Sequence, residues 1–334
     1  MREPDAGEGA GPAAGTGAVS VAPGARLGEG RRRIGVALGS GSARGLAHIG
    51  VLRALRDAGI QVDVVAGTSM GAFVGAIFAA GQLERLERDF LGFDWASIAS
   101  LLDPVFPRSG LLDGVKIGDF MRAHVQQANI EELPMPFRAM ATDIATGEEV
   151  VLGSGDLIAA VRASIAVPGV FTPVRSNGRV LVDGGLVNPV PVSAARALGA
   201  DLVIAVDLNH DIVTSRQRLP QAADHGANGA IAHALTQVLD GFESFQPPGI
   251  ANLREWLSRE RLPGILDVLL ASMYIMQARI TQATLLQDQP EVLIQPPLGS
   301  IRFMDYRRTA EIVEIGYQST VRVLDKLGLD PGAG

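Results

Sequence analysis

The stretch Val62–Gly81, "VDVVAGTSMGAFVGAIFAAG", joins two kinds of structure at one serine. The residues Val62–Ala66 are β-branched and apolar, which predicts a short buried strand. The apolar run after Ser69 is long enough for three turns of helix. Gly67 and Gly71 stand two residues from the serine on either side. The stretch therefore predicts a sharp strand-to-helix turn with Ser69 at its tip.

The residues Gly67–Gly71, "GTSMG", match the G-x-S-x-G pattern of a nucleophile elbow. Such a turn brings the flanking backbones together, so that a side chain two residues from the serine would clash. It exposes the serine hydroxyl near the N–H groups that begin the following helix. Because glycine is abundant, with 40 residues in 334, chance produces the pattern in roughly one such chain in four. A plain βα turn with a capping Ser or Thr is the alternative interpretation.

The same alternation of strand and helix begins earlier in the chain. Ile34–Leu38 is a short apolar run that predicts another buried strand. Four apolar residues at helical spacing follow it, and Gly59 closes the predicted helix: Leu46, Ile49, Leu52 and Leu55. A β-α-β-α order opens a parallel sheet that is covered by helices. We therefore expect an α/β fold.

The rest of the chain extends this pattern with one interruption. Further strands are predicted within 137–152, 179–182 and 291–294, and helices within 154–166, 264–286 and 306–327. Residues 191–209 predict a helix followed by another buried strand. Residues 83–135 contain several prolines and a short helical segment near Lys116–Val125, which indicates an insertion that could cover a site. Residues 211–248 resemble a loose polar excursion. We expect one domain over 31–329, a disordered Gly-, Ala- and Pro-rich tail over 1–30 and a short tail over 330–334.

Composition narrows the function. The chain is 47% apolar, as is typical of a well-packed globular protein. Its net charge of −7 argues against a nucleic-acid partner, which would require a basic surface. It contains no cysteine, which excludes disulfides, thiolate nucleophiles and Cys-ligated metals. No calcium-loop spacing of carboxylates is visible, so we expect no metal and no cofactor. No secretory signal and no membrane-spanning stretch are visible, so we expect a cytoplasmic protein.

A glycine-rich turn, Gly39–Gly45 "GSGSARG", lies between the first predicted strand and helix. A P-loop would need Gly-Lys-[Ser/Thr], which is missing. A dinucleotide fingerprint would need its last glycine one residue before Gly45 and an acidic residue at the end of the second strand, and the chain has neither. A row of main-chain N–H groups that stabilises a developing negative charge, an oxyanion hole, fits best. Adjacent parallel strands would place this loop beside Ser69.

A serine nucleophile needs a base. The chain has five histidines: His48, His124, His210, His225 and His233. Only His210, just past a strand, resembles the histidine of an α/β-hydrolase triad, but that fold places its nucleophile after several strands. Asp183 is the better candidate, because it ends a predicted strand in "DGG" and its carboxylate would emerge at the end of that strand. Asp-Gly alone is a common turn signal.

In this order, "GSGSARGLAHIGVL", "GTSMG" and "DGG" resemble the patatin-like phospholipases. The resemblance continues through "ATDIATGEEV", "AVRASIAVPGVFTPV" and "SMYIMQARI", and so covers nearly everything after the tail. It implies a three-layer fold with a mainly parallel central sheet flanked by helices. It also implies a lipid acyl hydrolase that uses a Ser–Asp dyad without histidine.

Carried over residue by residue, the resemblance makes Ser69 the nucleophile and Asp183 its base. It places the oxyanion hole at the N–H groups of Gly41 and Ser42, supported by Gly39, Arg44 and Gly45. Arg44 either holds the loop or merely occupies the first turn of a helix. The family loop is richer in glycine, and here Ser40 and Ser42 stand at glycine positions. If these positions need positive φ, serine is strained there.

The expected substrate is a phospholipid, a lysophospholipid or another fatty-acyl ester, and any membrane contact is expected to be transient. Six apolar residues of the insertion would line an acyl channel, touch a membrane or simply pack on the core: Leu101, Leu102, Val105, Phe106, Leu111 and Leu112. Since an ordinary aspartate has a pKa near 4, the dyad requires a partly desolvated site or a strong oxyanion hole. Two alternatives remain: a nucleotide-binding α/β protein, and a non-catalytic family member that binds acyl chains or partners.

Overall fold

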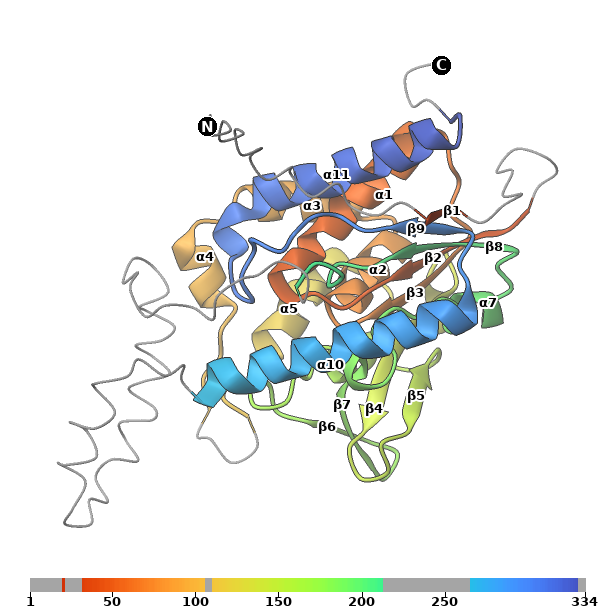
Figure 1. The fold of residues 1–334 in the computed structure, drawn as a ribbon. Coiled ribbons are helices and arrows are strands. Elements are labelled where there is room, and N and C mark those ends of the chain that lie inside the picture. Colours follow the sequence, from red (N-terminus) through yellow and green to blue (C-terminus); the bar gives the residue numbers. More distant parts are fainter. Residues whose placement is uncertain (1–19, 22–31, 106–109, 213–264, 330–334) are drawn as a thin grey trace, which may run out of the picture.

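The structure, a computed structural model, describes residues 20–21, 32–105, 110–212 and 265–329 (Figure 1). The strands are β1 (Ser20–Val21), β2 (Ile34–Leu38), β3 (Val64–Thr68), β4 (Phe137–Asp143), β5 (Glu149–Leu152), β6 (Val174–Ser176), β7 (Arg179–Asp183), β8 (Leu202–Val206) and β9 (Val292–Ile294). The α-helices are α1 (Ala47–Asp57), α2 (Met70–Ala79), α3 (Leu83–Leu91), α4 (Trp95–Ser100), α5 (Val115–His124), α6 (Leu157–Ser164), α7 (Val192–Ala197), α10 (Ile265–Asp288) and α11 (Thr309–Lys326). The 3-10 helices are η1 (Ser42–Leu46), η2 (Ile130–Glu132), η3 (Gly184–Leu186) and η4 (Tyr306–Arg308).

Within the described residues, the strands form one nine-stranded sheet in the order β1-β9-β8-β2-β3-β4-β7-β6, with β5 paired to β4. The central strands β9, β8, β2, β3 and β4 run parallel, whereas β1, β5, β6 and β7 add antiparallel pairs. Helices α1, α3 and α11 cover one side of the sheet, and α7 and α10 lie on the other (Figure 1). The expected three-layer fold with a mainly parallel central sheet is confirmed.

Most predicted elements are present with small shifts at their ends. The strand predicted at Val62–Ala66 is β3, which begins two residues later and runs to Thr68. Ser20–Val21, within the expected disordered tail, pairs with β9 as a short strand, so the expectation fails for these two residues. The rest of the tail and residues 213–248 of the predicted polar excursion lie outside the described residues. The domain limits at 31–329 stay a prediction.

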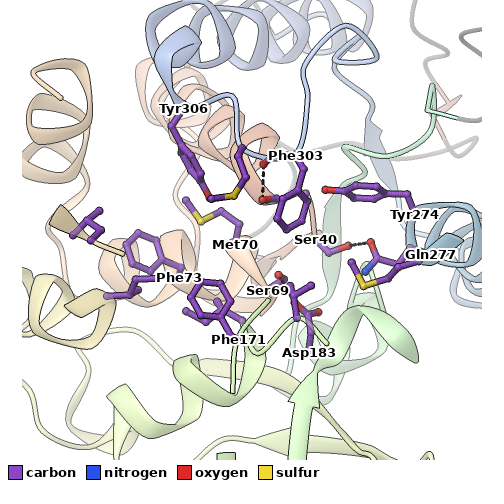
Figure 2. A pocket seen from close by; sticks show the side chains of 18 of the residues that line it. Ser40, Ser69, Met70, Phe73, Phe171, Asp183, Tyr274, Gln277, Phe303 and Tyr306 are labelled. Carbon is purple, nitrogen blue, oxygen red and sulfur yellow. Dashed lines mark hydrogen bonds between the residues drawn. The ribbon is translucent and has the colours of Figure 1, made fainter. Parts of the chain in front are cut away.

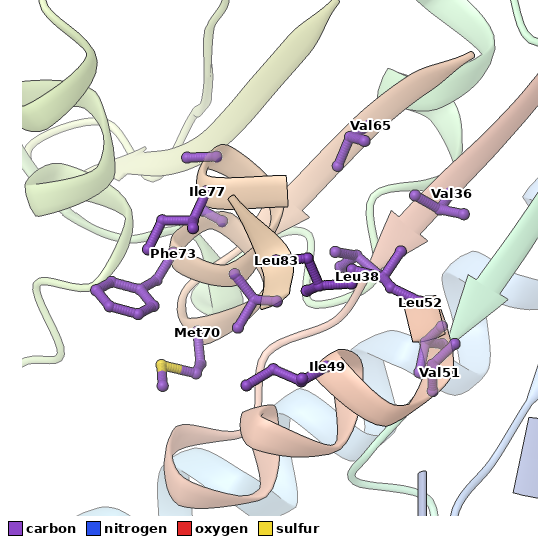
Figure 3. Packing of buried hydrophobic residues seen from close by; sticks show 14 of the residues in the cluster. Val36, Leu38, Ile49, Val51, Leu52, Val65, Met70, Phe73, Ile77 and Leu83 are labelled. Atoms are coloured by element: carbon purple, nitrogen blue, oxygen red, sulfur yellow. The ribbon is translucent and has the colours of Figure 1, made fainter. Parts of the chain in front are cut away.

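The two faces of the sheet carry side chains of different size. In β2, Val36 and Leu38 join the large core cluster beneath α1, α2 and α11, whereas Ala37 faces the smaller cluster with α7. In β8, Ile204 and Val206 likewise belong to the large cluster, whereas Val203 and Ala205 belong to the smaller one on the other face. Because successive residues of a strand point to opposite faces, this alternation of large and small residues gives the sheet one thick and one thin layer. Figure 3 shows residues of the thick layer. The thick layer anchors the helix that follows Ser69.

The helices α1 and α11 cross in direct backbone contact. A methyl group at Gly50 would lie 1.9 Å from the carbonyl oxygen of Val313, and one at Gly316 would lie 2.2 Å from that of Ala47. Each helix therefore needs a glycine where the other helix passes. This crossing joins the C-terminal helix of the chain to the helix that follows the glycine-rich turn.

We predict that Gly316→Ala destabilises the protein by on the order of 2 kcal/mol, although alanine favours a helix by about 1 kcal/mol over glycine. The added methyl group would force α11 away from α1. The matched control is Gly92→Ala, because Gly92 has an ordinary φ of −83° and the nearest atom to a methyl group there is 3.4 Å away. Equal free energies of unfolding in urea for the two variants would contradict the close contact.

Candidate active site

Ser69 occupies the turn between β3 and α2 in a strained backbone conformation. Its φ is 57° and its ψ is −124°, a region that costs a residue with a side chain about 1–3 kcal/mol. The Ser69 N–H donates a hydrogen bond of 2.9 Å to Oγ of Ser164, at the end of α6. This bond helps to hold the strained turn. The serine is 6% exposed, so its hydroxyl faces a recess rather than open solvent.

The two glycines of the elbow are required by close backbone approach, as the sequence predicted. A methyl group at Gly67 would lie 2.4 Å from the carbonyl oxygen of Gly71. One at Gly71 would lie 2.1 Å from the carbonyl oxygen of Leu38 and 2.7 Å from that of Gly39. The first turn of α2 therefore packs directly on the end of β2. Because β2 and β3 are parallel neighbours, the glycine-rich turn does lie beside the serine.

Strand register brings Asp183 to the same level as Ser69. Thr68, the last residue of β3, pairs with Met140 of β4, and the next residue of β4, Ala141, pairs with Asp183. The sequence did not indicate that β7 runs antiparallel to β4. β7 therefore runs in the opposite direction to β3 and β4. Its last residue, Asp183, pairs with the part of β4 that continues beyond the end of β3.

Ser69 and Asp183 are in direct contact. Ser69 Oγ donates a hydrogen bond of 2.5 Å to Asp183 Oδ2, and Figure 2 shows these two side chains next to each other. The N–H of Gly185 donates a hydrogen bond of 2.7 Å to Oδ1. The Thr142 hydroxyl donates to the backbone carbonyl of Asp183 at 2.9 Å. The aspartate is fully buried, at 0% exposure. Its orientation is thus fixed on both carboxylate oxygens and on the main chain.

Burial changes the chemistry of this carboxylate. Desolvation raises the pKa of Asp183 to about 6, against the lowering effect of the hydrogen bonds from Ser69 and Gly185. A carboxylate with a pKa near 6 is a stronger base than an ordinary aspartate and is still ionised at neutral pH. One of the two conditions that a Ser–Asp dyad was expected to need, a partly desolvated carboxylate, is therefore met.

Two residues of the glycine-rich turn, Gly41 and Ser42, line the same recess. Among the described residues, neither the Gly41 nor the Ser42 N–H donates to a protein acceptor, whereas those of Ala43 and Arg44 bond to Phe303 and Gly41. Ser42 has a positive φ of 48°, but Ser40 does not. The Ser42 hydroxyl donates to the carbonyl oxygen of Phe303 at 2.7 Å, which helps to hold this strained residue.

The remaining residues of the loop are packed on all sides. A methyl group at Gly39 would lie 2.5 Å from the Val206 carbonyl oxygen, and one at Gly45 would lie 2.2 Å from Cγ of Met70. Arg44 lies in η1 and is 3% exposed. Its guanidinium stacks on the Tyr274 ring, 4.4 Å from the centroid, so it also ties the loop to α10.

None of the described histidines contacts Ser69. His48 is buried in α1, where Nε2 donates to the Gly39 carbonyl oxygen at 2.7 Å. Desolvation lowers the pKa of His48 to about 4 and so keeps it neutral. His124 bonds to Asp89 at 2.8 Å, and His210 does not line the recess. His225 and His233 lie outside the described residues.

The recess opens into an apolar cavity of roughly 900 Å³, part of it open to solvent. Apart from the catalytic candidates and the loop, the lining is largely aliphatic and aromatic: Met70, Phe73, Ile98, Leu101, Leu102, Ile117, Ile165, Val167, Phe171, Met273, Tyr274, Gln277, Phe303, Met304 and Tyr306. Of the six apolar residues singled out in the insertion, Leu101 and Leu102 line the cavity, while Leu112 packs in a small core cluster. Phe106 lies outside the described residues.

Residues 20–21, 32–105, 110–212 and 265–329 contain no group of three or more His, Cys, Asp or Glu side chains that could hold a metal ion. None of their helices combines the length and the apolar character needed to span a membrane.

The sequence analysis did not identify Ser164 or Gln277, both of which contact the site. Ser164 binds the N–H of Ser69, and Gln277 Oε1 accepts a hydrogen bond of 3.1 Å from the Ser40 hydroxyl. Neither residue stands at a recognisable spacing from the elbow. Both lie in stretches that the family resemblance covers, "AVRASIAVPGVFTPV" and "SMYIMQARI", but the resemblance assigned neither residue a role.

The fold and the site identify a three-layer α/β protein with a nucleophile elbow. The sequence model of the patatin-like phospholipases matches residues 36–196. An NTE family protein of Mycobacterium tuberculosis is 33% identical over 334 residues, which cover 89% of this chain and 93% of that protein. The chain belongs to the patatin-like phospholipase family, as the sequence motifs indicated.

One more distant relative and one solved structure differ from this chain in size. Patatin-like phospholipase domain-containing protein 6 of Homo sapiens is 30% identical over 296 residues, which cover 85% of this chain and 20% of that protein. The crystal structure of VipD from Legionella pneumophila has 15% sequence identity and a TM-score of 0.44, and the match covers 89% of this chain and 67% of that one.

We predict that Asp183→Asn stabilises the fold at neutral pH. The folded pKa of about 6 lies above the unfolded value near 4, so folding must bury an ionised group at a cost that develops as pH rises from 4 to 6. Above pH 6, the variant should exceed wild type by on the order of 2 kcal/mol in the free energy of unfolding. Near pH 4, this advantage should vanish.

Urea unfolding of both proteins between pH 4 and pH 8 measures this difference. Ser69→Ala is the matched control. It retains the buried carboxyl group and removes a hydrogen bond that lowers the pKa of Asp183, so its pH dependence should have the same direction as that of wild type and be at least as large. A difference between Asp183→Asn and wild type that is constant across this range would contradict the raised pKa.

Proposed function

We propose that the protein is a lipid acyl hydrolase, of phospholipase A or lysophospholipase type, that uses Ser69 as nucleophile and Asp183 as base. The observation that carries the proposal is the hydrogen bond of 2.5 Å between Ser69 Oγ and a buried carboxylate whose pKa is raised to about 6. This pair lies at the base of an apolar cavity beside two free N–H groups. Family membership supports the same chemistry.

In the first half-reaction, Ser69 Oγ attacks the ester carbonyl carbon and its proton moves to Asp183 Oδ2. The negative charge that develops on the carbonyl oxygen is stabilised by the N–H groups of Gly41 and Ser42. Gly39, Arg44 and Gly45 hold this loop in place through the contacts described above. When the C–O bond breaks, Asp183 returns the proton to the leaving alcohol, and the acyl group remains on Ser69.

In the second half-reaction, water replaces the alcohol. Asp183, again ionised, accepts a proton from the water as its oxygen attacks the acyl carbon. The same two N–H groups stabilise the second oxyanion. Collapse of this intermediate returns the proton to Ser69 Oγ and releases the fatty acid. One carboxylate thus serves both steps, with no histidine and no metal in the scheme.

The proposed substrate is a phospholipid, a lysophospholipid or another fatty-acyl ester. The aliphatic and aromatic lining suits an acyl chain, whose transfer from water is favourable by about 0.8 kcal/mol per buried CH₂. Such esters reside in membranes, so we propose transient contact with a membrane surface. The described lining includes no lysine, arginine or histidine, and we therefore do not propose the nucleotide-binding alternative.

We predict that Ser69→Ala and Asp183→Asn each lower kcat/KM for a fatty-acyl ester by at least about 10³-fold, because each removes one half of the proton-transfer pair. Hydrolysis of a soluble p-nitrophenyl acyl ester and fatty-acid release from lysophospholipid and phospholipid measure this loss. Asp143→Asn is the matched control. Asp143 is also a buried aspartate at the end of a strand, but it does not line the cavity.

A wild-type protein that binds fatty acid without hydrolysing any of these esters would contradict the proposal and favour the non-catalytic alternative. Full activity of Asp183→Asn would exclude Asp183 as the base.

We also predict that kcat/KM rises with pH through about 6 and is constant above it, since only the ionised Asp183 can accept the proton. Below this pH, activity should fall by about tenfold per unit, as for a single protonation. Initial rates with the soluble ester between pH 4.5 and pH 8.5 give this profile. A limb centred near pH 4 would mean that Asp183 is not desolvated in the working enzyme.

A further inference from the structure

Gln277 is a buried polar side chain that the proposed mechanism does not use. It lies on α10, 237 positions from Ser40 in the sequence, yet it lines the cavity beside the glycine-rich turn. The residue is only 3% exposed. A buried amide is unfavourable unless its oxygen and nitrogen find partners. Its contacts therefore indicate what it does at this position.

The carbonyl oxygen of Gln277 is bound by two donors. Oε1 accepts a hydrogen bond of 3.1 Å from the Ser40 hydroxyl (Figure 2). It accepts a second one of 3.3 Å from Nδ2 of Asn209. Asn209 Nδ2 also lies 3.1 Å from the Ser40 carbonyl oxygen. The Ser40 N–H donates to the carbonyl oxygen of Pro189 at 2.9 Å. Every polar group of Ser40 is thus bound, immediately before the free N–H groups of Gly41 and Ser42.

The nitrogen of Gln277 lies against the turn that holds Asp183. A methyl group at Gly185 would lie only 2.4 Å from Gln277 Nε2. The N–H of Gly185 is the group that donates to Asp183 Oδ1 at 2.7 Å. One side chain therefore contacts both the loop with the free N–H groups and the turn that orients the carboxylate.

We propose that Gln277 is a positioning residue for the esterase reaction. It fixes Ser40 by hydrogen bonding. It thereby holds the N–H groups of Gly41 and Ser42 in the correct position relative to Ser69 and Asp183. Gln277 acts through Ser40 rather than through the substrate. This role rests on the proposed function, since the position of these N–H groups matters only if they stabilise a reacting ester.

The serine at position 40 is what makes this arrangement effective. The family resemblance expects glycine here, and a glycine has no hydroxyl to donate to Gln277. Ser40 does not have a positive φ, so serine fits this position without backbone strain. Ser42, the next serine of the loop, is tied to Phe303 in a similar way. Two serine hydroxyls thus attach the loop to chain segments more than 200 residues away.

The test compares Gln277→Met, Ser40→Ala and the double variant with wild type, using kcat and KM for the soluble ester. Methionine matches glutamine in length but offers no comparable acceptor. Each single variant should lose about 10- to 100-fold in kcat, because small displacements of catalytic groups have effects of this size, with KM within about threefold of wild type. The double variant should lose no more than the worse single variant, since both changes break one linkage.

Gln282→Met is the matched control on the same helix, because Gln282 is exposed and bonds only to Arg279 among the described residues. It should keep the kcat of wild type. Thermal unfolding checks that each variant is folded, and a merely structural role would lower the melting temperature without a selective loss in kcat. If Gln277→Met does not fold, Ser40→Ala alone decides the outcome.

Two results would overturn the role of Gln277 while the proposed function stands. In one, wild type is active and the folded single variants keep its kcat. In the other, the losses of the two single variants multiply in the double variant, which would mean that they act separately. Ser69→Ala is run in parallel. If it hydrolyses the ester as fast as wild type does, the proposed function fails, and the role of Gln277 fails with it.

Discussion

The hydrogen bond between Ser69 and Asp183 depends on the register of three strands. β3 pairs with β4, and β4 pairs with β7, so that the residue after Thr68 and the last residue of β7 meet at one level. Because successive side chains of a strand alternate between faces, a slip of β7 by one residue would turn Asp183 away from the serine. The nine-stranded sheet formed by the described residues is the frame that prevents such a slip.

This geometry is unfavourable locally. Ser69 has positive φ, and a carboxylate with no exposed surface must be ionised for the proposed chemistry. Strain and desolvation of this kind are typical of functional sites, where the surrounding structure stabilises an arrangement that would not form alone. Here the stabilising contacts are the large core cluster behind α2 and the hydrogen bonds from Ser164, Thr142 and Gly185.

Local patterns made much of this structure predictable. The elbow and the order of strands and helices follow from apolar periodicity and from glycines at fixed positions. The order of the motifs also indicates Ser69 and Asp183 from the sequence alone. The antiparallel direction of β7 was not predictable in this way, because Asp-Gly-Gly ends a strand of either orientation.

Contacts between distant parts of the chain were not predictable either. Ser164 and Gln277 reach the site through tertiary packing, and no sequence spacing links them to it. Ser42 illustrates the same limit. Its sequence position suggested a strained serine, and only its bond to Phe303 accounts for how the strain is accommodated. The segments after residue 264 thus contribute more to the site than their sequence indicated, through Tyr274, Gln277 and Phe303.

The central claim is that Asp183 alone activates Ser69 for attack on an acyl ester. Labelling with a fluorophosphonate, followed by intact-mass analysis, tests it most directly, because the reagent reacts with an activated serine. We expect a single adduct on wild type that maps to Ser69, no adduct on Ser69→Ala, and labelling slower by at least about 10²-fold on Asp183→Asn. An adduct that persists on Ser69→Ala, or Asp183→Asn labelled at the wild-type rate, would contradict the claim.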